Sequence, residues 1–135
     1  LDLCRELGFR GALLVGHIGK LVKVAGGMLN THSKYGDCRM EILAAHAGKA
    51  GLSPEKIGEI LECVACDDAL RILQEAGCRE KALDSLNERI LFHLHHRAGE
   101  NLELGTILFS KEYGLLAQSA NALNLIENIT RGKIL

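Results

Sequence analysis

The sequence is poor in aromatic residues, which make up 4% of its 135 residues, and it contains no tryptophan and one proline. It also lacks an excess of either charge, because 16 lysine and arginine residues stand against 17 aspartate and glutamate residues. A chain with a net charge of -1 has no overall attraction to nucleic acid or to an anionic membrane. No apolar run reaches membrane-spanning length, and no signal peptide is visible.

The five cysteines lack the spacing of a disulfide framework. Cys63 and Cys66 have the spacing of a redox or metal-binding pair, but no second pair accompanies them. His95 does not share a helix face with His93 and His96, so these histidines do not form a metal site either. We therefore expect buried, unreactive cysteines, no protein-bound metal and a reducing, cytoplasmic location.

What is present is an apolar fraction of 47%, enough for one domain with a single core. The apolar run at residues 11–16 lies between glycines and is typical of a strand buried on both faces. Residues 102–110 and 115–118 fit the two strands of a hairpin. With the helical periodicity elsewhere, these patterns predict an α/β fold in which a small sheet of few strands packs with five to six helices.

Most of the chain has the 3.6-residue period of amphipathic helices. Ser53 and Pro54 predict a helix start, and glycines at positions 8, 51, 77, 99 and 132 predict helix ends. The expected inward-facing stripes are Met40, Leu43, Ala44 and Ala47; Ile57, Ile60, Leu61 and Val64; Ala69, Ile72, Leu73 and Ala76; Leu83, Leu86, Ile90 and Leu94; and Ala122, Leu125, Ile126 and Ile129.

The predicted strands are too few for a complete doubly wound domain. Residues 1–8 also read like the last two turns of a helix. Both observations favour an incomplete part of a larger layered α/β protein. A processed or trimmed small protein is the alternative.

Charge is distributed unevenly along the chain. Residues 9–39 contain five basic side chains and one acidic side chain, whereas residues 52–90 contain five basic and nine acidic ones. Residues 16–20, Gly-His-Ile-Gly-Lys, follow the predicted strand as a turn, at the place where open α/β sheets bind ligands, and a helix is expected from residue 21. Their spacing matches neither a P-loop nor a dinucleotide-binding loop.

What remains is an anion site lined by Lys20 and Lys23, which lie three residues apart on one helix face, with His17 as a hydrogen-bonding group. The alternative is a glycine-shaped turn beside solvated lysines.

Residues 30–33, Asn-Thr-His-Ser, are consecutive hydrogen-bonding side chains close to Asp37 and Arg39. They extend the predicted site. Local capping is the alternative, and Asp37 is expected to cap the helix that follows. For His32, acid–base chemistry and capping both remain open.

Residues 11–23, together with Asn30-Thr-His-Ser33, Asp37, Arg39 and residues 41–46, resemble the cobalt-precorrin-5B carbon-1 methyltransferase family of anaerobic cobalamin biosynthesis. The resemblance is specific over about the first 50 residues, weaker from Leu52, and visible again at 105–119. Family members are much longer. The resemblance thus implies that residues 1–135 are the C-terminal α/β domain of a longer enzyme, with a ligand-binding segment at 16–39 and the missing N-terminal portion as its partner.

The resemblance also implies S-adenosylmethionine as methyl donor and a cobalt-corrin tetrapyrrole precursor as acceptor, methylated at ring carbon 1. The acetate and propionate arms of such a macrocycle suit a cationic pocket. The expected substrate-binding residues are His17, Lys20, Lys23, Asn30, Thr31, Ser33 and Arg39, and the expected catalytic residues are His32 and Asp37. No residue is assigned to the methyl donor, and the segment is expected to be inactive alone. A non-catalytic α/β module that binds an anion or a protein partner is the alternative function.

Overall fold

The computed structural model describes residues 1–131 and has an α/β fold, which confirms the predicted class. This range holds seven α-helices, against the five to six expected, and Gly132 lies outside it. The elements are α1 (Asp2–Glu6), β1 (Gly11–His17), α2 (Ile18–Ala25), the 3₁₀ turn η1 (Ser33–Tyr35), α3 (Arg39–Lys49), α4 (Pro54–Leu61), α5 (Cys66–Glu75), α6 (Arg79–Ala98), β2 (Glu103–Ser110), β3 (Gly114–Gln118) and α7 (Ala122–Thr130).

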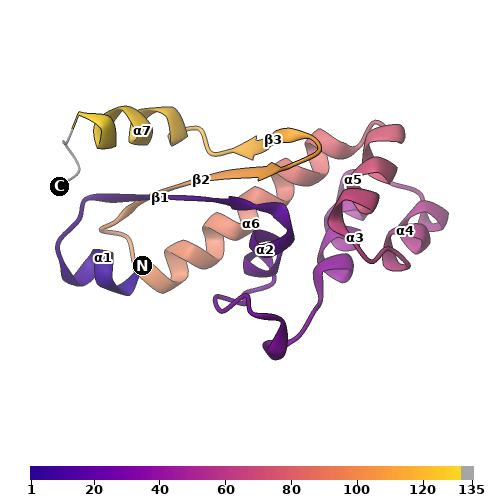
Figure 1. The fold of residues 1–135 in the computed structure, drawn as a ribbon, viewed down its shortest axis with the longest axis horizontal. Coiled ribbons are helices and arrows are strands. Elements are labelled where there is room, and N and C mark those ends of the chain that lie inside the picture. Colours follow the sequence, from indigo (N-terminus) through magenta and orange to yellow (C-terminus); the bar gives the residue numbers. More distant parts are fainter. Residues whose placement is uncertain (132–135) are drawn as a thin grey trace.

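The sheet has the order β1-β2-β3 (Figure 1). Strands β1 and β2 are parallel, with the register running from Gly11 opposite Glu103 to His17 opposite Phe109. Strands β2 and β3 form the predicted antiparallel hairpin, with an irregularity between Leu108 and Phe109. Helices α2 and α6 pack on one face of the sheet, which we call the inner face, and α7 lies on the outer face (Figure 1). Helices α3 to α5 form a group beyond the end of β1 (Figure 1).

The expectation that β1 is buried on both faces is wrong. Val15, in the middle of the strand, leaves 53% of its surface exposed, and the neighbouring residues are only partly buried. Within the described residues β1 is an edge strand, and the outer face beyond α7 is open. A continuous apolar run reports the preference of the side chains for burial, and it does not show which neighbours supply that burial.

The helical stripes are confirmed where the helices are long. All four predicted residues of α3 and of α6 are buried, and α6 forms the centre of the core. Three shorter stripes are partly wrong, because Leu61, Val64, Ala76, Ile126 and Ile129 are exposed. Val64 lies beyond the end of α4 and Ala76 is the C-cap of α5, so neither belongs to a buried helical turn. None of the described helices combines the length and apolarity needed to span a membrane.

Candidate anion-binding site

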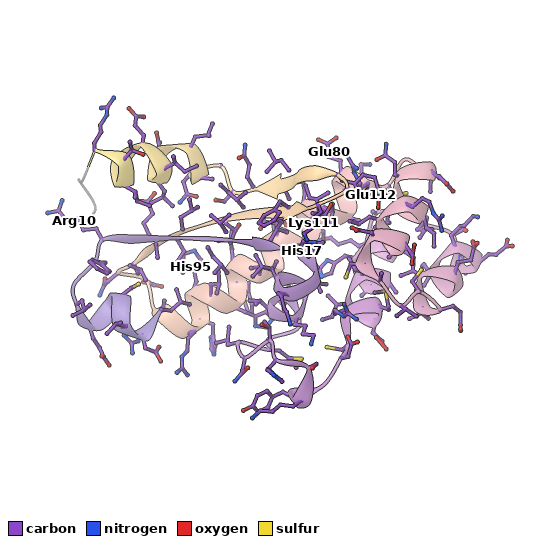
Figure 2. All side chains as sticks on the ribbon, in the orientation of Figure 1. Arg10, His17, Glu80, His95, Lys111 and Glu112 are labelled. Carbon is purple, nitrogen blue, oxygen red and sulfur yellow. The ribbon has the colours of Figure 1, made fainter. Side chains whose placement is uncertain are left out.

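His17 joins the carboxyl end of β1 to the first turn of α2 (Figure 2). Its Nδ1 accepts the N–H of Gly19 at 2.9 Å, which caps the helix. The helix therefore begins at Ile18, directly after the strand, which corrects the expected turn at 16–20 and the expected start at Leu21. Because Nδ1 is an acceptor, the neutral imidazole of His17 carries its proton on Nε2. A Cβ at position 19 would lie 3.1 Å from Nδ1, so a glycine fits this cap closely.

A hollow of about 440 Å³ lies beside this turn and brings together six of the residues predicted from the sequence. The sheet edge, the first turns of α2, and the start of α3 supply its walls. Its lining residues are His17, Gly19, Lys20, Lys23, Ser33, Asp37 and Arg39. The position matches the rule that open α/β sheets bind ligands beyond the carboxyl ends of their strands.

Lys23 is 3% exposed, although it is a lysine. Its Nζ donates one hydrogen bond, of 3.2 Å, to the carbonyl oxygen of Thr31. Among the described residues no carboxylate lies within ion-pair distance of this ammonium. A buried charge without an ionic partner is costly, and a bound anion would reduce this cost. Anion binding in the hollow stays a prediction.

Arg39, in contrast, is already paired. Its Nε and Nη2 donate to the two carboxylate oxygens of Asp37 at 2.9 and 3.0 Å, and Nη2 also donates to the carbonyl of Val64. The side-chain and backbone hydrogen bonds from Arg39 lower the pKa of Asp37 to about 2. The carboxylate is therefore ionised at neutral pH and offsets the charge of Arg39. Lys20 and Lys23 form no ion pair among the described residues, although the charge of Lys23 also contributes to the lowered pKa of Asp37.

The predicted cap at Asp37 is displaced by one position. Helix α3 begins at Arg39. Cys38 is its N-cap residue, but the side chain of Cys38 makes no capping hydrogen bond. Asp37 Oδ1 still accepts the N–H of Arg39 at 3.2 Å, so the carboxylate bonds the first helical N–H from one residue further out.

Asn30, Thr31 and His32 do not line the hollow, and their hydrogen bonds shape the segment that borders it. Asn30 Oδ1 accepts the N–H of His32 at 3.2 Å, and His32 Nδ1 accepts the N–H of Lys34 at 3.1 Å, which caps η1. Thr31 contributes its carbonyl to Lys23. The contacts of His32 are those of the capping alternative, and a catalytic role for it stays a prediction.

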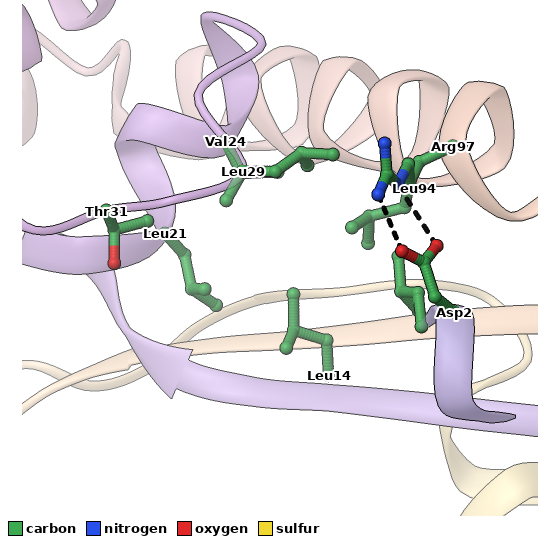
Figure 3. A pocket seen from close by; sticks show the side chains of 9 residues that line it. Asp2, Leu14, Leu21, Val24, Leu29, Thr31, Leu94 and Arg97 are labelled. Atoms are coloured by element: carbon green, nitrogen blue, oxygen red, sulfur yellow. Dashed lines mark hydrogen bonds and ion pairs between the residues drawn. The ribbon is translucent and has the colours of Figure 1, made fainter. Parts of the chain in front are cut away.

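A second cavity, of about 480 Å³, lies on the inner face of the sheet, between β1, α1, α2 and α6 (Figure 3). Its walls are mainly leucines and Val24. The two charged residues in its lining neutralise each other, because Arg97 donates to both carboxylate oxygens of Asp2 at 3.0 and 2.6 Å. Its volume is slightly larger than that of the hollow at His17, but it offers no unpaired charge to an anion. Sequence reasoning missed this cavity, since the leucines that build it come from five separate parts of the chain.

All five cysteines are free thiols, and burial raises the pKa of Cys66 and of Cys63. Cys66 lies against Arg39, which partly opposes that shift. Within residues 1–131 no group of three or more potential metal ligands comes together. The expectation of buried cysteines is confirmed for Cys66, at the start of α5, and is wrong for the other four, which are only partly buried.

Fold and site together define an α/β domain with a cationic hollow at the carboxyl end of a parallel strand. A family model described as "CbiD, C-terminal domain" matches residues 30–120, and the chain belongs to this family. No solved structure matches it significantly.

Curated relatives carry the name cobalt-precorrin-5B C(1)-methyltransferase. The protein of Alkaliphilus metalliredigens is 44% identical over 115 residues, which cover 85% of this chain and 30% of the relative. That of Ruminiclostridium cellulolyticum is 42% identical, covering 82% and 29%, and that of Sulfolobus acidocaldarius is 40% identical, covering 88% and 33%. The chain thus spans about a third of the length of the curated relatives it matches. The resemblance seen in the sequence is confirmed.

Proposed function

We propose that this chain is the C-terminal part of a cytoplasmic enzyme of anaerobic cobalamin biosynthesis that methylates cobalt-precorrin-5B at ring carbon 1. The hollow beside α2 holds carboxylate arms of the tetrapyrrole. Support comes from the names of the relatives, from the family assignment and from the charge of the hollow. The remaining length of the relatives accounts for parts of the enzyme outside this chain.

The buried ammonium of Lys23 carries the proposal. It faces the hollow with no described carboxylate within ion-pair distance, and the nearby Asp37 is already bonded to Arg39. A carboxylate of the substrate therefore supplies the direct counter-charge. A charge-assisted hydrogen bond formed there is stronger than a neutral one because little water competes. Lys20, which is exposed at the rim, adds attraction during approach.

Neutral hydrogen-bond donors complete the recognition of oxygen atoms. The Nε2–H of His17 and the hydroxyl of Ser33 belong to residues that line the same hollow as Lys23. Since the Nδ1 of His17 is occupied by Gly19, this imidazole acts toward the ligand as a donor. Asn30, Thr31 and His32 hold the bordering segment in the shape that keeps Thr31 on Lys23.

In the proposed reaction S-adenosylmethionine is the methyl donor. The new bond joins the methyl carbon to ring carbon 1, while the sulfur–methyl bond breaks and its electron pair stays on sulfur. Such an in-line displacement depends mainly on holding donor and acceptor in line. The role of this domain is to anchor the acceptor. The ionised carboxylate of Asp37 suits charge stabilisation, because its lowered pKa leaves no proton to donate at neutral pH.

The test is the affinity of the full-length enzyme for the cobalt-corrin substrate in Lys23→Met and Lys34→Met variants. Lys34 is the matched control, since it is exposed and does not line the hollow. We expect the Kd to rise at least about thirty-fold for Lys23→Met, as for the loss of one partner of a buried charge pair. Lys34→Met should bind as the unmodified protein does.

Equal affinity in all three proteins would contradict the proposed carboxylate anchor. Substrate binding without transfer of a methyl group from S-adenosylmethionine by the full-length protein would favour the non-catalytic anion-binding module instead. Absence of both binding and transfer would reject the function as a whole.

A further inference from the structure

The outer face of the sheet is covered at one end only. Strand alternation places Leu13, Val15 and His17 on this face. Helix α7 packs over the first part of it, where a Cβ at Gly105 would lie 2.5 Å from Leu125 and 3.1 Å from Leu13. Toward the carboxyl ends of β1 and β2, no described helix continues this layer.

Large apolar side chains are exposed on the uncovered part. Val15, Phe109 and Leu115, which we call the outer-face patch, are 53%, 37% and 57% exposed. The strand register brings them onto one surface, because Phe109 lies opposite His17 on β1 and opposite Leu115 on β3. Parallel strands in α/β proteins are normally covered on both faces, so an open patch on such a pair marks an interaction surface.

The patch borders the candidate site directly. The ring of His17 meets the ring of Phe109 edge to face, with centroids 5.9 Å apart, and His17 also lines the hollow of Lys23. A layer placed on Phe109 and Val15 would therefore stand at the mouth of the hollow.

We propose that the outer-face patch is the docking surface for the N-terminal portion of the full-length protein. The inference rests on the family assignment and not on the chemistry of the reaction. The matched residues make up 29–33% of the length of these relatives, so most of each relative lies outside the matched region. A covalently linked portion reaches the patch at high effective concentration. A second copy would need about 800 Å² per partner, far more than three side chains provide.

Cysteine accessibility in the full-length protein tests the proposal. Val15→Cys and Leu115→Cys are each alkylated with iodoacetamide, and the rate at the new site is followed by peptide mass spectrometry, which separates it from the native thiols. Gln74→Cys, on the exposed side of α5, is the control. We expect both patch positions to react at least about ten-fold more slowly than the control, as buried interface positions do.

Equal rates at the patch and at position 74 would overturn the proposal. Protection that disappears when the protein is diluted would also overturn it, because a second copy would then be the cover. Protection that persists on dilution supports it. Since the readout needs neither substrate nor methyl donor, the result stands even if the proposed reaction proves wrong.

Discussion

The side-chain oxygen of Asn87 on α6 accepts a 2.6 Å hydrogen bond from the hydroxyl of Thr106 on β2. Both residues are buried, so this bond ties the long central helix to the middle strand inside the core. Buried polar groups are costly when they lose their partner, and much less so when both partners are removed.

Removing one partner of this bond should therefore lower the free energy of unfolding by more than the net contribution of the hydrogen bond itself. We expect Thr106→Val to lower the free energy of unfolding by about 1–3 kcal/mol, because Asn87 keeps an unsatisfied oxygen. The double variant Asn87→Leu with Thr106→Val should lose less than the sum of the two single variants. Denaturant unfolding of all four proteins in a double-mutant cycle measures the coupling. Strict additivity would show that the bond contributes nothing.

Lys23→Met should stabilise the ligand-free protein. The substitution removes a buried ammonium whose single hydrogen bond goes to Thr31, and it keeps an unbranched side chain that is one heavy atom shorter. We expect a gain of about 1 kcal/mol in the free energy of unfolding, together with the loss of anion affinity predicted above. Thermal unfolding without ligand is the measurement. A marked loss of stability would mean that Lys23 is a structural residue.

His46 should make stability depend on pH. Its Nδ1 lies 2.8 Å from the hydroxyl of Ser85 between α3 and α6, and burial, followed by the nearby charges of Lys49 and Arg89, lowers its pKa. The unfolded chain has the ordinary value of about 6.5 and binds the proton more readily. Stability is therefore full above that pH and declines as the pH falls through the folded-state pKa.

Denaturant unfolding between about pH 5 and 8 tests the contribution of His46. We expect the decline toward acid to be smaller in His46→Gln. The pKa of His93 is also lowered by burial, so the difference between the two proteins, and not the slope of either, isolates His46. Identical slopes would exclude a contribution from His46.

Cys66 should be the slowest cysteine to react. It is buried at the start of α5, and burial raises the pKa of its thiol, so little thiolate is present near neutral pH. Alkylation of the folded protein, mapped by mass spectrometry, should leave Cys66 unmodified after the partly exposed Cys4 and Cys38 have reacted. Rapid modification of Cys66 would reopen the redox interpretation of the Cys63–Cys66 pair.

The sequence predicted the long helices well because burial in α3 and α6 follows one dominant period. It could not show that β1 is an edge strand with Val15 exposed, because the same apolar run of residues would fit a central strand equally well. The early start of α2 was missed because a histidine side chain makes the cap, and histidine is not a usual capping residue.

Within the site, the number of charged residues identified the basic segment, but it did not show which basic side chain lacks an ion-pair partner. Lys20 and Lys23 look equivalent in the sequence, yet only Lys23 is buried. Arg39 and Asp37 are two residues apart, a spacing that does not place them together on a helix, and they pair because Asp37 lies just outside α3. Such differences arise from tertiary packing, which a local pattern does not contain.

The parallel pairing of β1 with β2 also determines when this domain can form during synthesis. Gly11 pairs with Glu103 and His17 with Phe109, so β1 lacks its partner among the described strands until the ribosome has released α2 to α6 and most of β2. Contacts so distant along the chain form slowly. The nascent domain therefore carries β1 without β2 while the residues between the two strands are synthesised, a period in which chaperone binding would protect the apolar strand from aggregation.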